Sequence, residues 1–150
     1  MSIWVTPLTL DELNERERLT AAGRCGIRFT AIGADWLEAT APLDPRTAAP
    51  DGSLHVGALA ILAETVGSIA TNLCLDPSVH SAVGQVLDVT HPWPVIAGPV
   101  RARAHPLALD ASSHVWSIDM RDSTDSWVSN ARLTMALIRA RPRLRLDGGR

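Results

Sequence analysis

A single carboxylate in an apolar segment is the feature of the sequence that most suggests chemistry. Between residues 52 and 75, Glu64 is the only Asp, Glu, Arg or Lys. Burying a carboxylate without a partner costs a large desolvation energy and raises its pKa. A group in such a place is therefore either a structural hydrogen-bond hub or a functional acid or base.

Two further groups near Glu64 have chemical potential. Residues 51–57 join a flexible loop to the expected start of a helix, where the first N–H groups lack intrahelical partners and are able to hold an oxyanion. Ser68 lies four residues after Glu64, one turn further along the same helix face. Its hydroxyl could hold the carboxylate or an attacking water, although a small residue there would equally serve close helix packing.

Composition excludes several other chemistries. All 14 basic residues are arginine and tyrosine is absent, so a lysine Schiff base, a P-loop lysine and a tyrosine acid are excluded. The five histidines and two cysteines have no metal-ligand or redox spacing, so we expect no metal and no cofactor. With a net charge of -2, only the arginine-rich C-terminus could attract nucleic acid, and we expect no such partner.

Helix patterns occur in two places. Residues 9–22 are expected to form a short helix, because Thr9 and Glu12 have the spacing of a capping box and Gly23 suits a helix end. Residues 55–73 are apolar on almost all sides, which is typical of a buried helix. A carboxylate at bilayer depth is costly, so the charge of Glu64 argues against a membrane span.

Strand patterns occupy most of the remaining sequence. The clearest spans residues 99–109, where small apolar residues alternate with Arg101, Arg103 and His105. The predicted strands cover residues 27–31 and 36–40 (a hairpin), 82–91, 99–109, 114–121 and 127–139. The order predicts one α+β domain, an antiparallel sheet around a long central helix with a short N-terminal helix.

The chain is expected to divide into an N-terminal helical extension (1–25), the main domain (26–139) and an arginine-rich tail (140–150). The tail is either a solvated end or a phosphate-attracting segment. No secretory signal begins the sequence, so we expect a cytoplasmic protein.

The segment Gly52-Ser53-Leu54-His55-Val56-Gly57, followed by Leu62-Ala63-Glu64-Thr65, resembles hotdog-fold thioesterases of the phenylacetate-degradation and 4-hydroxybenzoyl-CoA thioesterase type. Their motif is Gly-x-x-His-Gly-Gly at the start of a central helix, with an Asp or Glu nine residues after the histidine. That acidic position is Glu64 here. The resemblance covers roughly residues 26–139, including a strand, proline and glycine pattern over residues 86–98, and implies a hotdog fold.

The resemblance also implies a shared active site. In that family the carboxylate is the nucleophile or general base on an acyl-CoA thioester, and the amide after the motif histidine polarises the carbonyl. These roles fall on Glu64 and Val56. Eight residues of helix span about 12 Å, so one helix cannot present both groups to one thioester carbon. Two chains must contribute, and we expect a homodimer with antiparallel central helices, or a dimer of dimers.

The other motif positions have less direct roles. His55 lies about half a helical turn from Glu64, so we expect it to orient the loop, while Gly57 is the second glycine of the motif. Two positions depart from the family: Val56 replaces the first glycine, and Ala49 stands where relatives carry Asn or Gln. Loss of that amide is expected to slow the reaction about 10- to 1,000-fold if it acts as an oxyanion donor.

Binding of CoA would require phosphate contacts and an acyl pocket. Arg101, Arg103 and Arg139 are the candidates for the phosphates, although arginines on an exposed strand face are also ordinary solubility residues. Trp93 is the candidate to line an acyl or aryl pocket. The leading hypothesis is an acyl-CoA thioesterase that needs no cofactor. The alternatives are a non-catalytic hotdog domain that binds acyl-CoA or another apolar ligand and, third, a hotdog dehydratase or hydratase.

Overall fold

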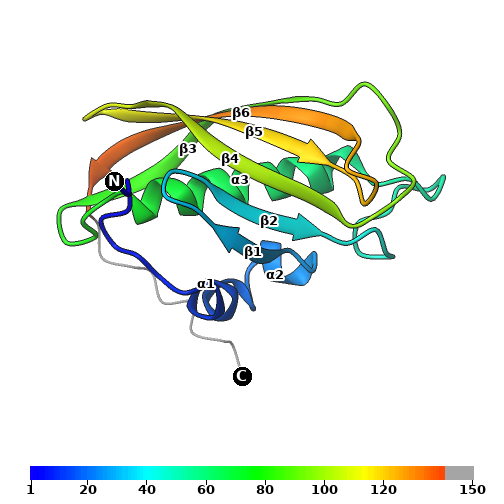
Figure 1. The fold of residues 1–150 in the computed structure, drawn as a ribbon, viewed down its shortest axis with the longest axis horizontal. Helices are drawn as coiled ribbons and strands as arrows, with labels where there is room; N and C mark the ends of the chain where they lie inside the picture. Colours follow the sequence, from blue (N-terminus) through cyan, green and yellow to red (C-terminus); the bar gives the residue numbers. More distant parts are fainter. Residues whose placement is uncertain (141–150) are drawn as a thin grey trace.

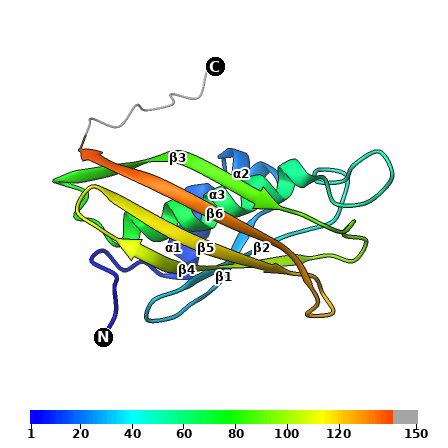
Figure 2. The same ribbon diagram turned by 90° about the horizontal axis from the view of Figure 1, so that it is seen from above.

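A six-stranded antiparallel sheet wraps around one long helix in this computed structural model, which describes residues 1–140 (Figures 1 and 2). The sheet order is β1-β2-β4-β5-β6-β3. The helices are α1 (Leu10–Glu17), α2 (Ala21–Arg24) and α3 (Val56–Leu73). The strands are β1 (Arg28–Ile32), β2 (Leu37–Ala41), β3 (His80–Thr90), β4 (Val100–Leu109), β5 (Ser113–Arg121) and β6 (Trp127–Arg139). This is the expected α+β hotdog arrangement.

The core lies between α3 and the concave face of the sheet. On β4, Val100, Ala102 and Ala104 are buried while the residues between them are partly exposed, which confirms the predicted alternation. α3 approaches the sheet closely at Gly67, where an added Cβ would lie 2.6 Å from Leu133 Cδ2. The largest buried side chains of this core include Leu59, Leu62, Val66, Trp116, Ile118, Met120, Leu133 and Met135.

α3 is long and apolar enough to cross a membrane by length and composition, but 56% of it is buried inside the fold. The predicted helix over residues 55–73 agrees with its observed bounds to one residue. Burial on most sides is typical of a core helix.

The N-terminal extension differs from the single helix predicted over residues 9–22. The capping box at Thr9 and Glu12 is present, but α1 ends at Glu17. Thr20 then caps the separate short helix α2. Gly23 lies inside α2, and the turn out of it is made at Gly26, whose φ of +74° favours glycine.

Residues before α1 fasten the extension to the main domain. The Val5 and Thr6 N–H groups both donate to the carbonyl of Leu73 at the end of α3. The Trp4 ring stacks on the buried Trp116 ring with 6.4 Å between centroids. The extension is thus attached at the C-terminal end of α3. The expected arginine-rich tail lies, apart from Ala140, outside the described residues.

Candidate active site

The N-terminus of α3 presents one backbone N–H for binding. His55 is the N-cap, and its Nδ1 accepts a hydrogen bond of 2.8 Å from the Gly57 N–H. The Gly57 amide is therefore occupied by the His55 side chain. The Val56 N–H has no hydrogen-bond partner within residues 1–140. This geometry leaves the Val56 N–H as the available donor, while the His55 side chain caps the start of α3.

The loop before α3 is held by backbone hydrogen bonds. The His55 N–H donates to Thr47 O, and the Leu54 N–H donates to Val95 O. Between these anchors the chain makes a tight turn in which the Ala49 N–H donates to Ser53 O at 2.7 Å. The loop therefore fixes the position of the helix N-terminus relative to the segment that follows β3.

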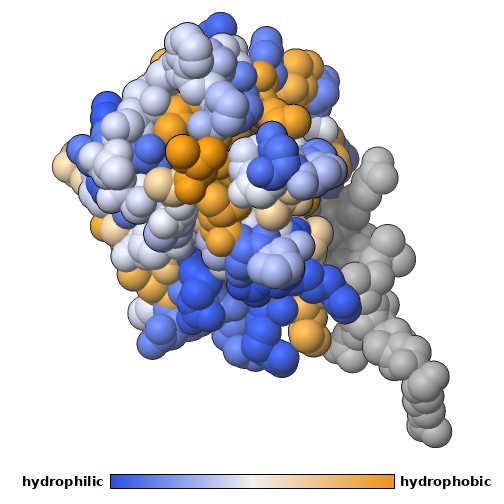
Figure 3. Space-filling view, turned by 90° about the vertical axis from the view of Figure 1, so that its right-hand side faces the viewer, coloured by the Kyte–Doolittle hydropathy of each residue, from blue (hydrophilic) through white to orange (hydrophobic). Residues whose placement is uncertain are grey.

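An open cavity of about 460 Å³ lies at this end of α3 and brings together Ala49, His55, Val56 and Trp93. Val56 is 47% exposed and Trp93 68% exposed. Figure 3 shows apolar side chains gathered among polar ones at the end of the molecule that is on the right in Figure 1. Val56, which carries the free amide, thus lines this open cavity with an exposed side chain.

Glu64 lies further along α3 and faces a different cavity of about 390 Å³. Its carboxylate is half-buried and forms no ion pair with any residue in the described part of the chain. Burial raises the pKa of the Glu64 carboxyl above its ordinary value, the negative charge of Glu17 raises it further, and the Ser68 hydroxyl acts in the opposite direction. The arrangement suits a general base or nucleophile rather than a structural ion pair.

Strand β3 passes directly beside Glu64. A Cβ built on Gly84 would lie 3.6 Å from Glu64 Oε1, so the glycine leaves space next to the carboxylate. β3 pairs only with β6 and forms an edge of the sheet. Glu64 is thus placed near the unpaired edge of the fold, where a second molecule could reach it.

The two cavities share no lining residue. Eight residues of helix separate Val56 from Glu64, a distance of about 12 Å along the axis. A single chain therefore holds two separate halves of the expected site, the amide half at the start of α3 and the carboxylate half at its middle.

The three arginines selected for CoA phosphates lie elsewhere. Arg101 and Arg103 are on the sheet face opposite to α3, because alternation along β4 sends the neighbouring alanines inward. Both form ion pairs with Glu38, and Arg101 also pairs with Asp125. The Arg103 guanidinium also lies 4.1 Å from the centroid of the Trp36 ring. Neither arginine lines either cavity of the candidate site.

Arg139 is at the far end of β6, opposite His80 in the β3–β6 register, and is also outside both cavities. Within residues 1–140 there is no group of three or more His, Cys, Asp or Glu side chains able to hold a metal ion. The structure brings Ala49, His55, Val56 and Trp93 together in one cavity and places Glu64 in the other. Ser68 contacts the Glu64 carboxyl but does not line that cavity.

Sequence reasoning missed Glu17. This last residue of α1 lines the Glu64 cavity together with Thr20, Ala21 and Ala22 of the extension. Nothing in the spacing between Glu17 and Glu64 indicates that they meet, since their proximity comes from packing of α2 on α3. The only sequence signal was the acidic character of the predicted N-terminal helix.

Comparison with known proteins places this geometry in context. A family model described as the thioesterase superfamily matches residues 51–127. A 1,4-dihydroxy-2-naphthoyl-CoA hydrolase of Escherichia coli is 38% identical over 136 residues, which are 91% of this chain and 99% of that protein.

Two crystal structures extend the similarity to the whole fold. A thioesterase of Haemophilus influenzae is 39% identical with a TM-score of 0.89, covering 94% of this chain and 98% of that chain. A mutant thioesterase of Pseudomonas aeruginosa is 37% identical with a TM-score of 0.90, covering 92% of this chain and 99% of that chain. The similarity therefore includes the N-terminal extension as well as α3 and the sheet.

Proposed function

The chain belongs to the thioesterase superfamily and is a thioester hydrolase, and we propose that it cleaves an aryl or medium-chain acyl-CoA thioester using Glu64. The observation that carries this proposal is a half-buried glutamate that faces a cavity, lacks an ion-pair partner within residues 1–140 and has a raised pKa. The E. coli relative, named for hydrolysis of an aryl-CoA, supports an aryl acyl group.

The proposed reaction begins with the thioester carbonyl oxygen accepting a hydrogen bond from the Val56 N–H. In the nucleophilic route, a Glu64 oxygen attacks the carbonyl carbon, the carbon–sulfur bond breaks, and CoA leaves as a thiolate that takes up a proton. Water then hydrolyses the resulting anhydride. In the general-base route, Glu64 takes a proton from the attacking water, and this proton goes to the departing sulfur. Both routes yield a carboxylic acid and CoA thiol.

Glu64 must be ionised in either route. Because the pKa of Glu64 is raised, its carboxylate is a stronger base than that of an ordinary glutamate. For the same reason, the carboxylate becomes protonated at a higher pH than an ordinary glutamate when the solution is acidified. The rate is therefore expected to fall as the pH drops through the raised pKa.

The proposal requires a homodimer, because one chain separates Val56 from Glu64. The long edge strand β3 exposes Val83 (48%) and Val86 (58%), and exposed apolar edges of this kind favour pairing with another chain. A second copy across this edge would bring the α3 N-terminus of one subunit toward Glu64 of the other. Association of two such dimers into a tetramer is compatible with the same active sites.

The decisive experiment is hydrolysis of a panel of acyl- and aryl-CoAs, followed by release of the CoA thiol. Wild-type protein should hydrolyse at least one of them, and Glu64→Gln, which keeps the size of the side chain, should reduce kcat at least 100-fold. Equal activity of wild type and variant, or no activity of the wild type on any ester, would contradict the proposal. The mass in solution should be that of a dimer or tetramer, and a monomer would contradict the shared site.

A non-catalytic acyl-CoA binding domain is the other function that the sequence suggests, because of Ala49 and the Val56 side chain in the cavity at the start of α3. The thioesterase names of the relatives favour the hydrolase. Calorimetry distinguishes the two, because a binder would take up a CoA ester saturably without releasing thiol.

A further inference from the structure

The cavity at Glu64 is covered by the N-terminal extension rather than by the sheet alone. Its lining is mainly apolar, and its only charged members are Glu64 and Glu17. The remaining members are Thr20, Ala21, Ala22, Ala60, Ile61, Thr65 and Leu87. An acyl group attached to a thioester at Glu64 would therefore extend along small apolar side chains with a second carboxylate within the same space.

Glu17 is fixed in this place by the turn between α1 and α2. The Thr20 hydroxyl donates to Glu17 Oε2 at 2.7 Å and also lies 2.8 Å from the Glu17 carbonyl oxygen. Thr20 is itself the N-cap of α2, so the hydroxyl that holds Glu17 belongs to a structured turn. Within the described chain no arginine forms an ion pair with Glu17. Glu17 thus lines the Glu64 cavity without an ion-pair partner in the described residues, and it also lines the neighbouring cavity beside Arg16 and His80.

The electrostatic effect of Glu17 reaches the reactive carboxylate. Its charge is the second cause of the raised pKa of Glu64, after burial. A ligand atom in the same cavity would experience the same charge. A third carboxylate, placed on the acyl group, would be repelled by Glu17 and Glu64 together, whereas an uncharged acyl group would meet the apolar lining.

We propose that Glu17 is a specificity-determining residue that makes the enzyme favour uncharged acyl groups over CoA monothioesters of dicarboxylic acids. This inference rests on the proposed function, since it concerns the acyl side of the same reaction. It assigns to the N-terminal extension a role in substrate choice, because α1 supplies a second negative charge beside that of Glu64 on the central helix.

The test compares substrates that differ only by the terminal carboxylate. Hexanoyl-CoA is paired with adipoyl-CoA, and benzoyl-CoA with 4-carboxybenzoyl-CoA, all at pH 8. The ratio of kcat/KM for the uncharged ester to kcat/KM for the charged ester is measured for each variant. Because both values come from the same preparation, the ratio does not depend on the fraction of folded protein.

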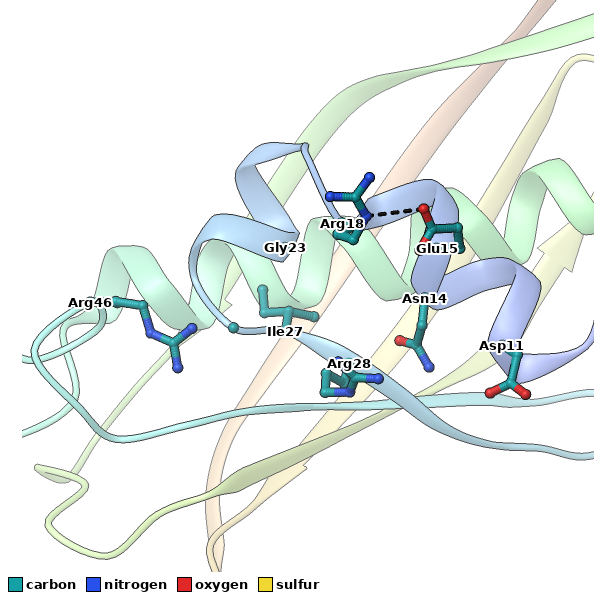
Figure 4. Close-up of a pocket in the computed structure, with 9 residues that line it drawn as sticks. Asp11, Asn14, Glu15, Arg18, Gly23, Ile27, Arg28 and Arg46 are labelled. Carbon is teal, nitrogen blue, oxygen red and sulfur yellow. Dashed lines mark hydrogen bonds and ion pairs between the residues drawn. The ribbon is translucent and has the colours of Figure 1, made fainter.

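Glu17→Gln should lower this ratio roughly tenfold, as expected for removing one unit charge several ångströms away in a partly wet cavity. Glu17→Asp should keep the ratio within about threefold of wild type, because the charge remains. The matched control is Glu15→Gln, which removes the same charge from the same helix. Glu15 points toward Arg18 in a separate cavity lined by α1, β1 and Arg46 (Figure 4), and its substitution should leave the ratio unchanged.

Each outcome decides a different point. An unchanged ratio in Glu17→Gln, or an equal change in Glu15→Gln, would overturn the role of Glu17 while leaving the thioesterase function intact. No turnover of any uncharged ester by wild-type protein would overturn the proposed function and this inference with it. A tenfold change confined to Glu17→Gln would establish the charge at this position as the basis of selection.

Discussion

Val56→Pro tests the oxyanion role of one backbone amide with unusually little disturbance of the fold. Val56 is the first residue of α3, a position where proline is well tolerated because the N–H makes no intrahelical bond. The preceding residue must adopt an extended conformation before proline, and His55 already has φ -67° and ψ 132°. The substitution therefore deletes the Val56 N–H and leaves the helix start in place.

The expected effect is large on catalysis and small on stability. Removing one oxyanion donor costs about 100- to 1,000-fold in kcat. The Val56 amide has no partner within residues 1–140, so no hydrogen bond of the fold is lost. The side chain is 47% exposed, and the free energy of unfolding should change by less than about 1 kcal/mol.

The assay measures kcat from thiol release on the best acyl-CoA of the panel, alongside urea unfolding. Val56→Ala is the matched control, since it shortens the side chain but keeps the N–H, and it should retain wild-type kcat or exceed it. If Val56→Pro folds normally and its kcat stays within threefold of Val56→Ala, the amide does not polarise the thioester and the reasoning is refuted.

Three further results are expected. Mixing and refolding Glu64→Gln with Val56→Pro should restore about a quarter of wild-type activity. Half of the dimers are then mixed, and one of the two sites in each pairs an intact Val56 amide with an intact Glu64. Activity no higher than that of the separate variants would exclude a shared site. Ala49→Gln should raise kcat/KM about tenfold or more, because it returns an amide donor to the cavity that contains Val56. An unchanged kcat/KM would show that this position does not contact the reacting atoms. Burial lowers the pKa of His114 below the ordinary histidine value of 6.5, so below pH 6.5 the unfolded chain takes up a proton that the folded protein does not. The free energy of unfolding should therefore fall by up to about 1.4 kcal/mol per pH unit below pH 6.5. Urea unfolding between pH 7.5 and 5.5 should show a smaller fall in His114→Gln, and an identical pH dependence would contradict this.

Local patterns in the sequence were sufficient for most of the fold. Burial of one strand face produces the alternation at residues 99–109, and burial of most of a helix produces the apolar profile of residues 55–73. Burial is the strongest constraint on residue type, so both patterns are visible in the sequence. The extent of the helix expected over residues 9–22 was wrong, because the prediction took Gly23 as the helix end and did not use Thr20, which caps a second helix.

The candidate site was predictable only where its members share one element. The spacing from His55 to Glu64 on α3 is local, and the sequence predicts it. The alternation along β4 indicates from the sequence that Arg101 and Arg103 face away from the core, but it does not indicate which cavity they approach. In the structure both arginines form ion pairs with carboxylates. Glu17 reaches Glu64 through tertiary packing, which leaves no trace in sequence spacing.

The stacked indoles of Trp4 and Trp116 provide an intrinsic optical probe of the N-terminal segment. Trp116 is fully buried and donates through Nε1 to Thr71 Oγ1 at 2.7 Å, while the Trp4 ring donates to Gly33 O at 2.7 Å. Release of the first few residues would break the ring contact without unpairing any strand. Fluorescence emission would then report detachment of the N-terminal segment that anchors the extension. This change could be measured separately from global unfolding.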